Sequence, residues 1–488
     1  MEKIIKYLEY YKIKGWLCGG TARDLKLGRE LNGIDVAVDC DLSTLREKLS
    51  SNITNINDYS TCVTLKYKDQ IYYLYPLKKI ELINTYYNFS FTNSLIEDSL
   101  SRDFTINSLY YDLPSKSFID HQGAEKDFNS KLIKFVGDPE TRILESKVRL
   151  IRAPILAAIL GPGWSIDNDS KLAIRRNRLK VATINPKQVN TEIIKLMTRA
   201  QHPSKAFELM HQLNLLDDFF PELERAIGIE QSNKAENLDL FRHIMLSMDS
   251  IDVNADNVLL LRLAALFHDI GKPYTETRIN GELHFYNHEN VGANLAEKIL
   301  YRWGFTKNFI NKVVNLIQNH LFDASPNKSI QSVKKLVLKV GPEAIHDLLD
   351  LRIADRMGTG RKDIKMTAID ELRKKVNQIL LEVNPSQFKL AIEDKQLKSL
   401  IGTEDFIDVT LVPTVKDYLL STIITDKIVN TKEEISKEVK NLQKIKCPLG
   451  KQHLFKTWTD ITNESADVFS NGKLKCGVYC SFICDKLV

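Results

Sequence analysis

The chain has 488 residues, of which 43% are hydrophobic and 27% are charged, and its formal net charge is +5. This length favours about two to four domains, and the composition is that of a folded globular protein, which excludes a disordered or fibrous chain. No apolar run approaches the roughly 20 residues that a membrane-spanning helix requires, and the first residues lack a secretory signal pattern. We therefore expect a soluble, cytoplasmic protein with no membrane partner.

The first 140 residues contain short β-branched and aromatic runs that are separated by turn signals. Such runs predict strands of one mixed sheet, with a short helix after Gly20. The predicted strand segments are WLCGG (16–20), IDVAVD (34–39), TCVTLKY (61–67), QIYYLYPL (70–77), FTINSLYYD (104–112) and KLIKFVG (131–137).

Helical periodicity replaces these strand signals from Glu140 onward. The predicted fold class is therefore α+β, a small mixed sheet with flanking helices followed by an all-α body. Polar stretches near 228–236 and 358–365 indicate loops or boundaries. The expected domains are residues 1–139, 140–230, 231–365 and 366–488.

Two clusters leave more than one interpretation open. Residues 171–180 contain five basic residues and no acidic one, a pattern that suits either a phosphate backbone or a solvated helix face. Cys476, Cys480 and Cys484 would share one helical face, where they suit a metal or redox cluster or, as we favour, reduced thiols. The lysine-rich region 366–488 carries no functional assignment.

A Gly-Gly turn joins the first predicted strand to the short helix. Gly19 and Gly20 let the backbone approach an anionic ligand, and the helix amides that follow can donate to phosphate oxygens. Asp35 on the next strand is placed to hold a Mg²⁺ ion beside such phosphates. Asp39 is in phase with Asp35, but it lies about 13 Å away at the rise of a strand.

Three blocks carry a resemblance to a known family. They are Gly19–Asp24 followed by Asp35, Arg102–Asn107 within 96–112, and a helical segment with Arg149 and Arg152. In order and spacing, these blocks resemble the tRNA CCA-adding enzymes and bacterial poly(A) polymerases, whose head belongs to the polymerase-β-like nucleotidyltransferases. The resemblance implies a nucleotidyltransferase head at 1–139 and a helical neck that binds RNA or nucleotide at 140–230.

The same resemblance implies roles for the matching residues. Asp35 is the expected catalytic residue and Mg²⁺ ligand, ATP and CTP are the expected nucleotides, and tRNA or another RNA 3′ end is the expected acceptor. The expected nucleotide-binding residues are Gly19, Gly20, Arg23, Arg102, Asp103, Asn107, Arg149 and Arg152.

Three positions depart from the family pattern. Gly33 stands where the family has a second metal-binding Asp, Ser146 where it has a base-reading Asp, and Ser101 where it has an Arg. Loss of a metal ligand weakens Mg²⁺ binding, and Ser146 has no charge to pair with Arg149. These departures favour an impaired or inactive head.

A second constellation lies in the helical body. His268-Asp269 ends an apolar stretch, and five of the ten His of the chain fall between positions 243 and 320. Imidazoles and carboxylates in this number suit Mn²⁺, Fe²⁺, Zn²⁺ or Mg²⁺, and the pattern resembles the HD metal-dependent phosphohydrolase domain, here within 231–365. The metal ligands that this resemblance implies are His243, His268, Asp269 and Asp355, with His288 and His320 for a second metal. We expect His284 on a neighbouring loop and His346 in a structural role.

Three hypotheses about function follow. The first is an RNA 3′-end nucleotidyltransferase, for tRNA CCA addition or a related addition, with an associated HD phosphohydrolase. The second is a degenerate head that binds RNA beside an HD domain that is the only active site. The third is an RNA-binding protein in which both sites are relics. The matching head residues favour the first, the three departures favour the second, and the intact HD set opposes the third.

Overall fold

The computed structural model describes residues 2–31, 33–49, 53–55, 62–67, 70–84, 86–231, 238–325, 328–360, 366–382, 390–401, 412–424, 427–443, 469–470 and 473–474. The chain forms two compact units, Met1–Asn311 with Gly358–Gly360 and Lys312–Met357 with Arg361–Val488. The three C-terminal residues Cys476, Cys480 and Cys484 lie outside the described residues, so their grouping stays a prediction.

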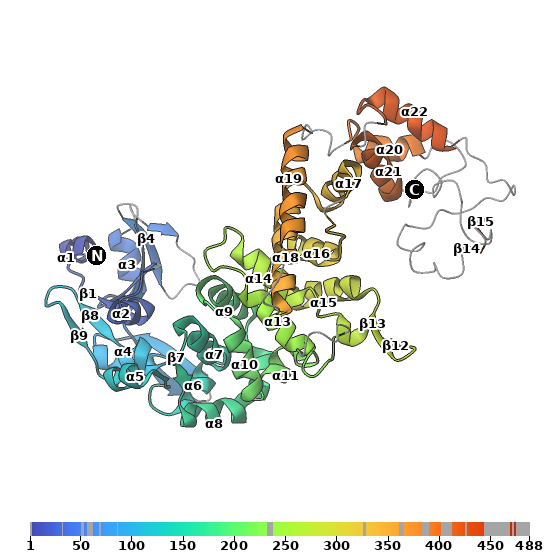
Figure 1. The fold of residues 1–488 in the computed structure, drawn as a ribbon. Coiled ribbons are helices and arrows are strands. Elements are labelled where there is room, and N and C mark those ends of the chain that lie inside the picture. The colour runs from blue at the N-terminus through green and yellow to red at the C-terminus, as the bar shows by residue number, and fades with distance from the viewer. Residues whose placement is uncertain are drawn as a thin grey trace. The chain divides into compact units, whose positions relative to one another are not determined.

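A seven-stranded mixed sheet forms the amino-terminal part of the first unit (Figure 1). Its strand order is β3-β4-β5-β2-β1-β8-β9; β2 and β5 are parallel, and the other neighbouring pairs are antiparallel. The strands are β1 (Gly15–Cys18), β2 (Ile34–Val38), β3 (Ile53–Asn55), β4 (Val63–Tyr67), β5 (Gln70–Pro76), β8 (Tyr110–Asp112) and β9 (Ser117–Ile119).

Alternation along β2 separates the two faces of this sheet, because successive strand residues point to opposite sides. Val36 packs with Leu8 of α1 and Leu45 of α3, whereas the neighbouring Ala37 belongs to a separate buried cluster with Tyr110. The helices of this part are α1 (Glu2–Tyr10), α2 (Gly19–Lys26), α3 (Leu42–Leu49), α4 (Leu95–Ser101) and α5 (Ala124–Ser130).

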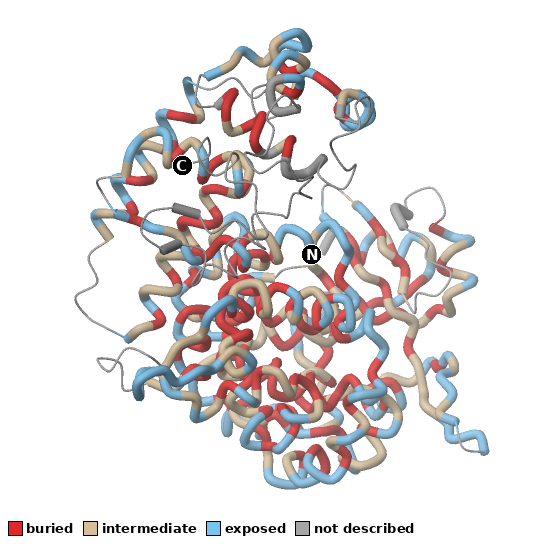
Figure 2. Tube along the Cα trace, turned by 90° about the vertical axis from the view of Figure 1, so that its right-hand side faces the viewer, coloured by how far each residue is buried: buried red, intermediate tan, exposed pale blue. Residues whose placement is uncertain are grey.

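The rest of the first unit is mainly helical, and its buried residues lie on inward-facing sides while exposed residues occupy the outer turns (Figure 2). The neck comprises α6 (Pro139–Glu145), α7 (Arg149–Leu160), α8 (Asn168–Asn177), the 3₁₀ helix η3 (Arg178–Thr183), α9 (Pro186–Arg199), α10 (Ser204–Gln212), α11 (Leu216–Phe219) and α12 (Pro221–Glu224). It is followed by α13 (Leu240–Asp249), α14 (Val258–Phe267), the 3₁₀ helix η4 (Lys272–Tyr274) and α15 (His288–Arg302), and the division between the units falls within α16 (Lys307–Asn319).

The second unit contains a small apolar core of its own, which includes Leu397, Leu419 and Ile435. Its helices after α16 are α17 (Ile330–Val340), α18 (Ile345–Gly358), α19 (Thr367–Glu382), α20 (Asp394–Ile401), α21 (Val412–Ile424) and α22 (Lys432–Gln443), followed by the short pair β14 (Phe469–Ser470) and β15 (Lys473–Leu474).

The predicted fold class is confirmed: a mixed sheet with flanking helices precedes a helical body. The four domain boundaries stay a prediction. Among the described residues, no helix combines the length and apolar character that crossing a membrane requires.

Several strands were not predicted. The hairpin β6 (Lys78–Ile83) and β7 (Tyr86–Phe91) stands apart from the main sheet, and a second hairpin, β12 (Glu276–Ile279) and β13 (Glu282–Phe285), interrupts the helical body. The second hairpin turns at Asn280-Gly281, where both residues have positive φ. Asn-Gly is a strong hairpin signal, which the polar composition of this segment obscured.

Two predicted strands are shorter than expected. The segment 131–137 contributes only β10 (Leu132–Ile133), which pairs in parallel with β11 (Ser165–Ile166) outside the main sheet. The segment 104–112 begins with the 3₁₀ helix η2 (Thr105–Asn107) and becomes β8 only at Tyr110.

Arg262 joins the neck to the helices that follow it. Its side chain on α14 is fully buried and donates to the carbonyl oxygens of Met197 and Ala200, at 2.7 and 2.8 Å, and of Ile251 at 2.8 Å. Burial lowers the pKa of Arg262, although Asp249 and Asp252 oppose this effect. The guanidinium therefore satisfies carbonyls at the carboxyl end of α9, which otherwise lack intrahelical partners.

Replacing Arg262 with Ala should lower the free energy of unfolding by about 3–5 kcal/mol, because the buried carbonyls would lose their donors and a cavity would remain. Urea unfolding followed by tryptophan fluorescence measures this change. Arg176→Ala is the matched control: that side chain is 71% exposed, so its loss should cost less than about 0.5 kcal/mol. Similar losses for the two variants would contradict the role assigned to Arg262.

Candidate active site of the head and candidate metal centre

The Gly-Gly turn lies where β1 ends and α2 begins. Gly19 has φ +58°, and a Cβ atom there would lie 3.3 Å from Nη1 of Arg102. A Cβ atom on Gly20 would lie 3.7 Å from Oδ2 of Asp35. The two glycines thus let Asp35 and Arg102 approach the amino terminus of α2, whose amides can bind an anion.

Asp35 lies on β2 beside this turn. Its backbone N–H donates to Oγ1 of Thr21 on α2 at 2.8 Å, which fixes the strand against the helix. Burial raises the pKa of Asp35, and nearby Arg102 and Lys195 partly offset that rise. A desolvated carboxylate of this kind gains from a bound cation. Mg²⁺ in phosphate-transfer sites is commonly held by one or two carboxylates together with the substrate phosphates, so Asp35 fits part of such a site.

Gly33, which stands where the family has a second metal-binding Asp, leaves little room for a side chain. Gly33 has φ +85°, and a Cβ atom there would lie 3.0 Å from the ring of Tyr73. An Asp at this position would therefore be strained and would have to displace the ring. Asp39 does not replace it, because Oδ1 of Asp39 accepts the N–H of Lys14 at 2.6 Å at the opposite end of β1 from Gly19.

Asp103 is the centre of a network behind the turn. Its carboxylate accepts from Nδ2 of Asn107 at 3.0 Å and from Nη1 of Arg152 at 3.0 Å. Asn107 in turn accepts from Nη1 of Arg23 at 2.8 Å. Burial alone would raise the pKa of Asp103, but Arg152 and Arg149 outweigh it and hold this pKa well below its usual value.

Arg152 is held by a second carboxylate, and Arg102 is held by a carboxylate of its own. Nε of Arg152 donates to Glu192 on α9 at 3.0 Å, and 31% of the Arg152 side chain stays exposed. Arg102 donates through Nη2 to Asp98 on α4 at 2.7 Å, and its guanidinium lies 5.3 Å from the centroid of the Tyr110 ring. These contacts fix the orientation of both guanidinium groups and leave some of their N–H donors available for a ligand.

Arg149 is placed differently from these two cations. It is 5% exposed, and it donates to Glu145 Oε2 at 2.7 Å and to the carbonyl of Ser101 at 3.0 Å. Ser146 ends α6 as its C-cap residue. Reading a nucleobase with Arg149 would require it to leave these partners, so its predicted role stays a prediction.

The basic segment 171–180 lies on α8 and η3. Arg178 pairs with Asp218 at 2.5 Å and Arg175 donates to the carbonyl of Gln212 at 3.0 Å, whereas Arg176 is mostly exposed. Part of the segment is thus used within the fold. The exposed part leaves open whether this segment binds a phosphate backbone or is a solvated helix face.

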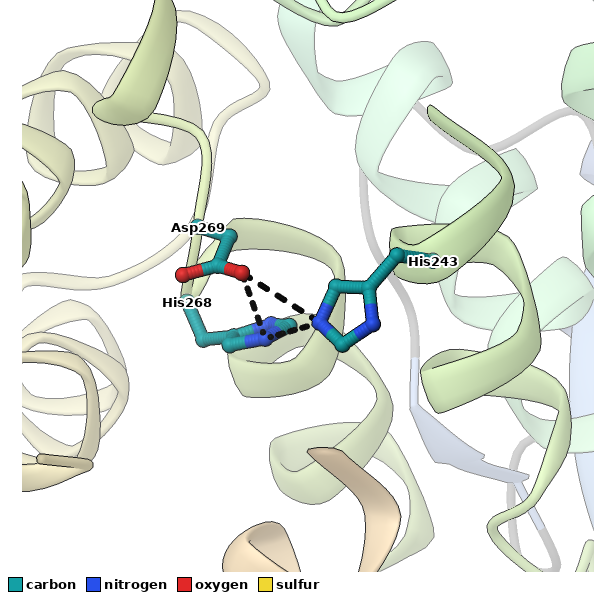
Figure 3. A group of neighbouring side chains, drawn as sticks. All are labelled: His243, His268 and Asp269. Atoms are coloured by element: carbon teal, nitrogen blue, oxygen red, sulfur yellow. Dashed lines mark hydrogen bonds and ion pairs between the residues drawn. The ribbon is translucent and has the colours of Figure 1, made fainter. Parts of the chain in front are cut away.

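His243, His268 and Asp269 converge in the helical body (Figure 3). His243 lies on α13, and the other two follow the carboxyl end of α14. Nε2 of His243 lies 3.1 Å from Nε2 of His268 and 3.2 Å from Oδ2 of Asp269, and all three residues are buried.

His288 extends this cluster from the first turn of α15. Its Nε2 lies 3.2 Å from Oδ1 of Asp269, whereas Nε2 of His243 lies 3.2 Å from Oδ2 of that carboxylate. Nδ1 of His268 faces the carbonyl of Ala265 at 2.8 Å, and Nδ1 of His288 faces that of Phe285 at 2.6 Å. If each Nδ1 donates to its carbonyl, the Nε2 lone pairs point at the cluster, as a metal site requires.

Lys272 is a member of this site that the sequence did not single out. Its Nζ lies 2.7 Å from Oδ2 of Asp269. Burial would raise the pKa of Asp269, but His268 and Lys272 hold it well below its usual value. Ring nitrogens and a carboxylate that converge in this way fit a divalent cation such as Mn²⁺, Fe²⁺ or Zn²⁺.

Two other predicted ligands belong to the second unit. His320 follows α16 and is buried, with Nδ1 2.7 Å from the carbonyl of Ile317, and Asp355 on α18 accepts from Nη1 of Arg352 at 2.7 Å. Their roles as ligands stay predictions. His346 on α18 contacts Arg373, with 3.5 Å between Nδ1 and Nη1. His284 lies on strand β13 and not on a loop, because the Asn-Gly turn forms a hairpin there.

Three family models match successive parts of the chain. The poly A polymerase head domain matches residues 15–134, the probable RNA and SrmB-binding site of polymerase A matches 163–227, and the HD domain matches 236–359. By these matches the chain is similar to the CCA-adding enzymes and poly(A) polymerases, which are nucleotidyltransferases. The families of the head model and of the HD model are both metal-dependent.

Similar proteins are found in bacteria. The CC-adding tRNA nucleotidyltransferase of Thermus thermophilus is 26% identical over 70% of this chain and 75% of its own length. Poly(A) polymerase I of Escherichia coli is 28% identical over 46% of this chain and 50% of its own length. The Bacillus stearothermophilus CCA-adding enzyme in complex with CTP shares the fold, with a TM-score of 0.60 at 19% identity over 90% of this chain and 96% of that one.

Asn in place of Asp103 should lower the free energy of unfolding by about 2 kcal/mol at pH 7, because Arg152 would lose its charged partner. The folded state depresses the pKa of Asp103, so its stabilisation is present above the unfolded-state pKa of about 3.9 and is lost as the pH falls towards the folded-state value. Urea unfolding at a series of pH values from 7 down to about 2 should therefore show the two proteins converging below about pH 4. Asp217→Asn, at an exposed site on α11, is the control. A difference from the parent that stays constant with pH would contradict this assignment.

Removing Asp269 should weaken Mn²⁺ binding by at least about 10- to 100-fold, because even outer-shell partners of metal sites contribute that much. Equilibrium dialysis of the parent and of Asp269→Ala, with metal counted per chain, measures the loss. His211→Ala is the matched control, since that His contacts Glu224 at 2.7 Å away from the cluster. Equal metal content in the parent and Asp269→Ala would exclude a metal centre there.

Proposed function

We propose that the head is an RNA 3′-end nucleotidyltransferase that adds CMP and AMP, or AMP alone, to tRNA or a related RNA in the cytoplasm. The observation that carries the proposal is the convergence of Asp35 and Arg102 on the glycine turn at the amino terminus of α2. Support also comes from the names of similar proteins, which include a CC-adding tRNA nucleotidyltransferase and a poly(A) polymerase.

The residues around the turn suit the handling of a nucleoside triphosphate. The amides of α2 and the guanidinium of Arg102 are placed to hold the phosphates, while Asp35 would hold Mg²⁺. When bound, Mg²⁺ supplies charge neutralisation at the phosphates and orientation of the attacking hydroxyl. In the transfer, the RNA 3′ oxygen forms a bond to the α-phosphorus and the bond to pyrophosphate breaks. Because Gly33 offers no second carboxylate, we expect this head to need a higher Mg²⁺ concentration for activity than a head with two carboxylate ligands.

Base recognition belongs, in this proposal, to the partly exposed Arg152. Asp103 and Glu192 hold this guanidinium from two sides, so it is preorganised for hydrogen bonds to a base edge. Arg149 would contribute only after it leaves Glu145 and the carbonyl of Ser101.

The HD centre supports a second activity, the hydrolysis of phosphoesters at RNA ends. Its buried ring nitrogens and carboxylate would hold a divalent metal, and a metal bound there would lower the pKa of bound water to near 7 and so supply a nucleophile. In this proposal His243, His268, Asp269 and Asp355 hold one metal, and His288 and His320 serve a second. Gly33 favours the variant of the proposal in which this is the only active site.

An assay with tRNA that lacks its 3′ CCA, Mg²⁺ and labelled CTP or ATP tests the head. We expect the parent and His268→Ala to incorporate label, and Asp35→Ala to lose at least about 100-fold, the loss of one metal ligand at the transferring phosphate. Incorporation that survives in Asp35→Ala would contradict the proposed site.

The same proteins test the alternative, in which the HD centre is the only active site. If the parent incorporates no label up to high Mg²⁺ concentration but releases phosphate from RNA ends, and that release needs His268, then the head is silent and the HD centre is the working site. Gly33→Asp is a poor restoring variant, because the positive φ and the Tyr73 ring oppose any side chain there.

A further inference from the structure

An aromatic rim lies directly beside the HD centre. We define it as Tyr274, His284, Phe285 and Tyr286, which come from η4, β13 and the residue after β13. These residues belong to the segment that runs from His268-Asp269 to His288, so the chain passes from the metal cluster to the rim and back within about twenty residues. The β12–β13 hairpin carries part of the rim and projects from the helices of its unit (Figure 1).

Two contacts couple the rim to the candidate metal ligands. The carbonyl of Phe285 lies 2.6 Å from Nδ1 of His288, so the rim backbone orients that ring. Lys272 reaches both sides: its Nζ lies 2.7 Å from Asp269 and 5.5 Å from the centroid of the Phe285 ring. A ligand on the rim would therefore lie next to the cluster.

The rim presents flat surface to solvent. Tyr286 is 63% exposed, and its ring is stacked on that of His284 with 5.3 Å between centroids and 9° between planes. Tyr274 is 40% exposed, and the guanidinium of Arg225 lies 5.3 Å from the centroid of its ring. Exposed rings at a phosphoester site are typical of base stacking in single-stranded nucleic acid binding.

Continuity with the RNA-binding segment favours RNA as the occupant. Arg225 lies within residues 163–227, which match the RNA-binding family model, so this segment contacts the rim through Arg225 and Tyr274. The positive charge of Arg278 on the hairpin is offset by acidic neighbours, because this side chain lies 3.6 Å from Glu230 and 3.8 Å from Glu276. Stacking, and not charge, would thus carry the recognition.

We propose that the terminal base of a single-stranded RNA 3′ end stacks on Tyr286, which presents the terminal phosphoester of that RNA to the HD centre. The inference rests on the HD part of the proposed function and adds the substrate class: a single-stranded end with an intact terminal base. Lys272, between the rim and Asp269, lies where the phosphate of such a ligand would pass.

Hydrolysis kinetics test the proposal in the full-length, Mn²⁺-loaded protein with Asp35→Ala, which removes the head activity. The substrate is a short single-stranded RNA that ends in a 2′,3′-cyclic phosphate, beside the same RNA with an abasic terminal nucleotide. Tyr286→Ala should raise KM for the intact RNA about 10-fold with kcat within about twofold, and Tyr286→Phe, which keeps the ring, should restore the parental KM. The abasic RNA should give one KM for all these proteins. Tyr301→Ala, at a Tyr that is 76% exposed on α15 outside the rim, is the matched control.

A binding measurement separates failure of the inference from failure of the HD activity. The fluorescence of an RNA with a terminal 2-aminopurine should be quenched when this RNA binds to the metal-free protein. Tyr286→Ala should reduce that quenching. Hydrolysis that is indifferent to Tyr286→Ala would overturn the inference while leaving the HD activity in place. Quenching that depends on Tyr286 without hydrolysis would uphold the rim and overturn the activity. Absence of both, or capture of a protein by the rim with no RNA effect, would overturn the inference.

Discussion

The need to neutralise one largely desolvated carboxylate, Asp103, organises the part of the molecule behind the glycine turn. A desolvated charge is costly unless charged and hydrogen-bonding partners surround it. Arg152 and Asn107 supply those partners at 3.0 Å each. Through Asn107 the network reaches Arg23 on α2, and through Arg152 it reaches α9. A single charge thus holds the helix after the glycine turn, the 3₁₀ turn η2 and two neck helices in register.

Helix α9 connects this network to the HD centre, which lies in the same unit. Glu192 in the middle of α9 holds Arg152, and Arg262 binds the carbonyls at the carboxyl end of α9. Arg262 lies on α14, which ends at His268-Asp269. The two sites are therefore linked by contacts of α9 with Arg152 and Arg262, although each site keeps its own chemistry.

Those chemistries differ in how each site meets a phosphate. At the glycine turn the head places one carboxylate, Asp35, together with glycine backbone and arginine donors, so a metal held there would need further ligands such as substrate phosphates. The HD centre offers converging imidazoles around Asp269 and needs no substrate to assemble. The strain that a side chain would meet at Gly33 explains why the head cannot regain a second carboxylate by a single exchange.

The sequence by itself determined the fold class and the motif residues, because periodicity and glycine and histidine spacing are local properties of the chain. It did not indicate Glu192, whose partner Arg152 lies 40 residues away on another helix. It also did not indicate that Asp98 pairs with Arg102 or Lys272 with Asp269, although these partners lie only four and three residues apart in the chain. Only the tertiary structure decided that Arg149 is turned inward and that Asp39 faces Lys14. Such choices depend on which groups can satisfy a buried charge after the elements have packed, and no spacing in one segment records them.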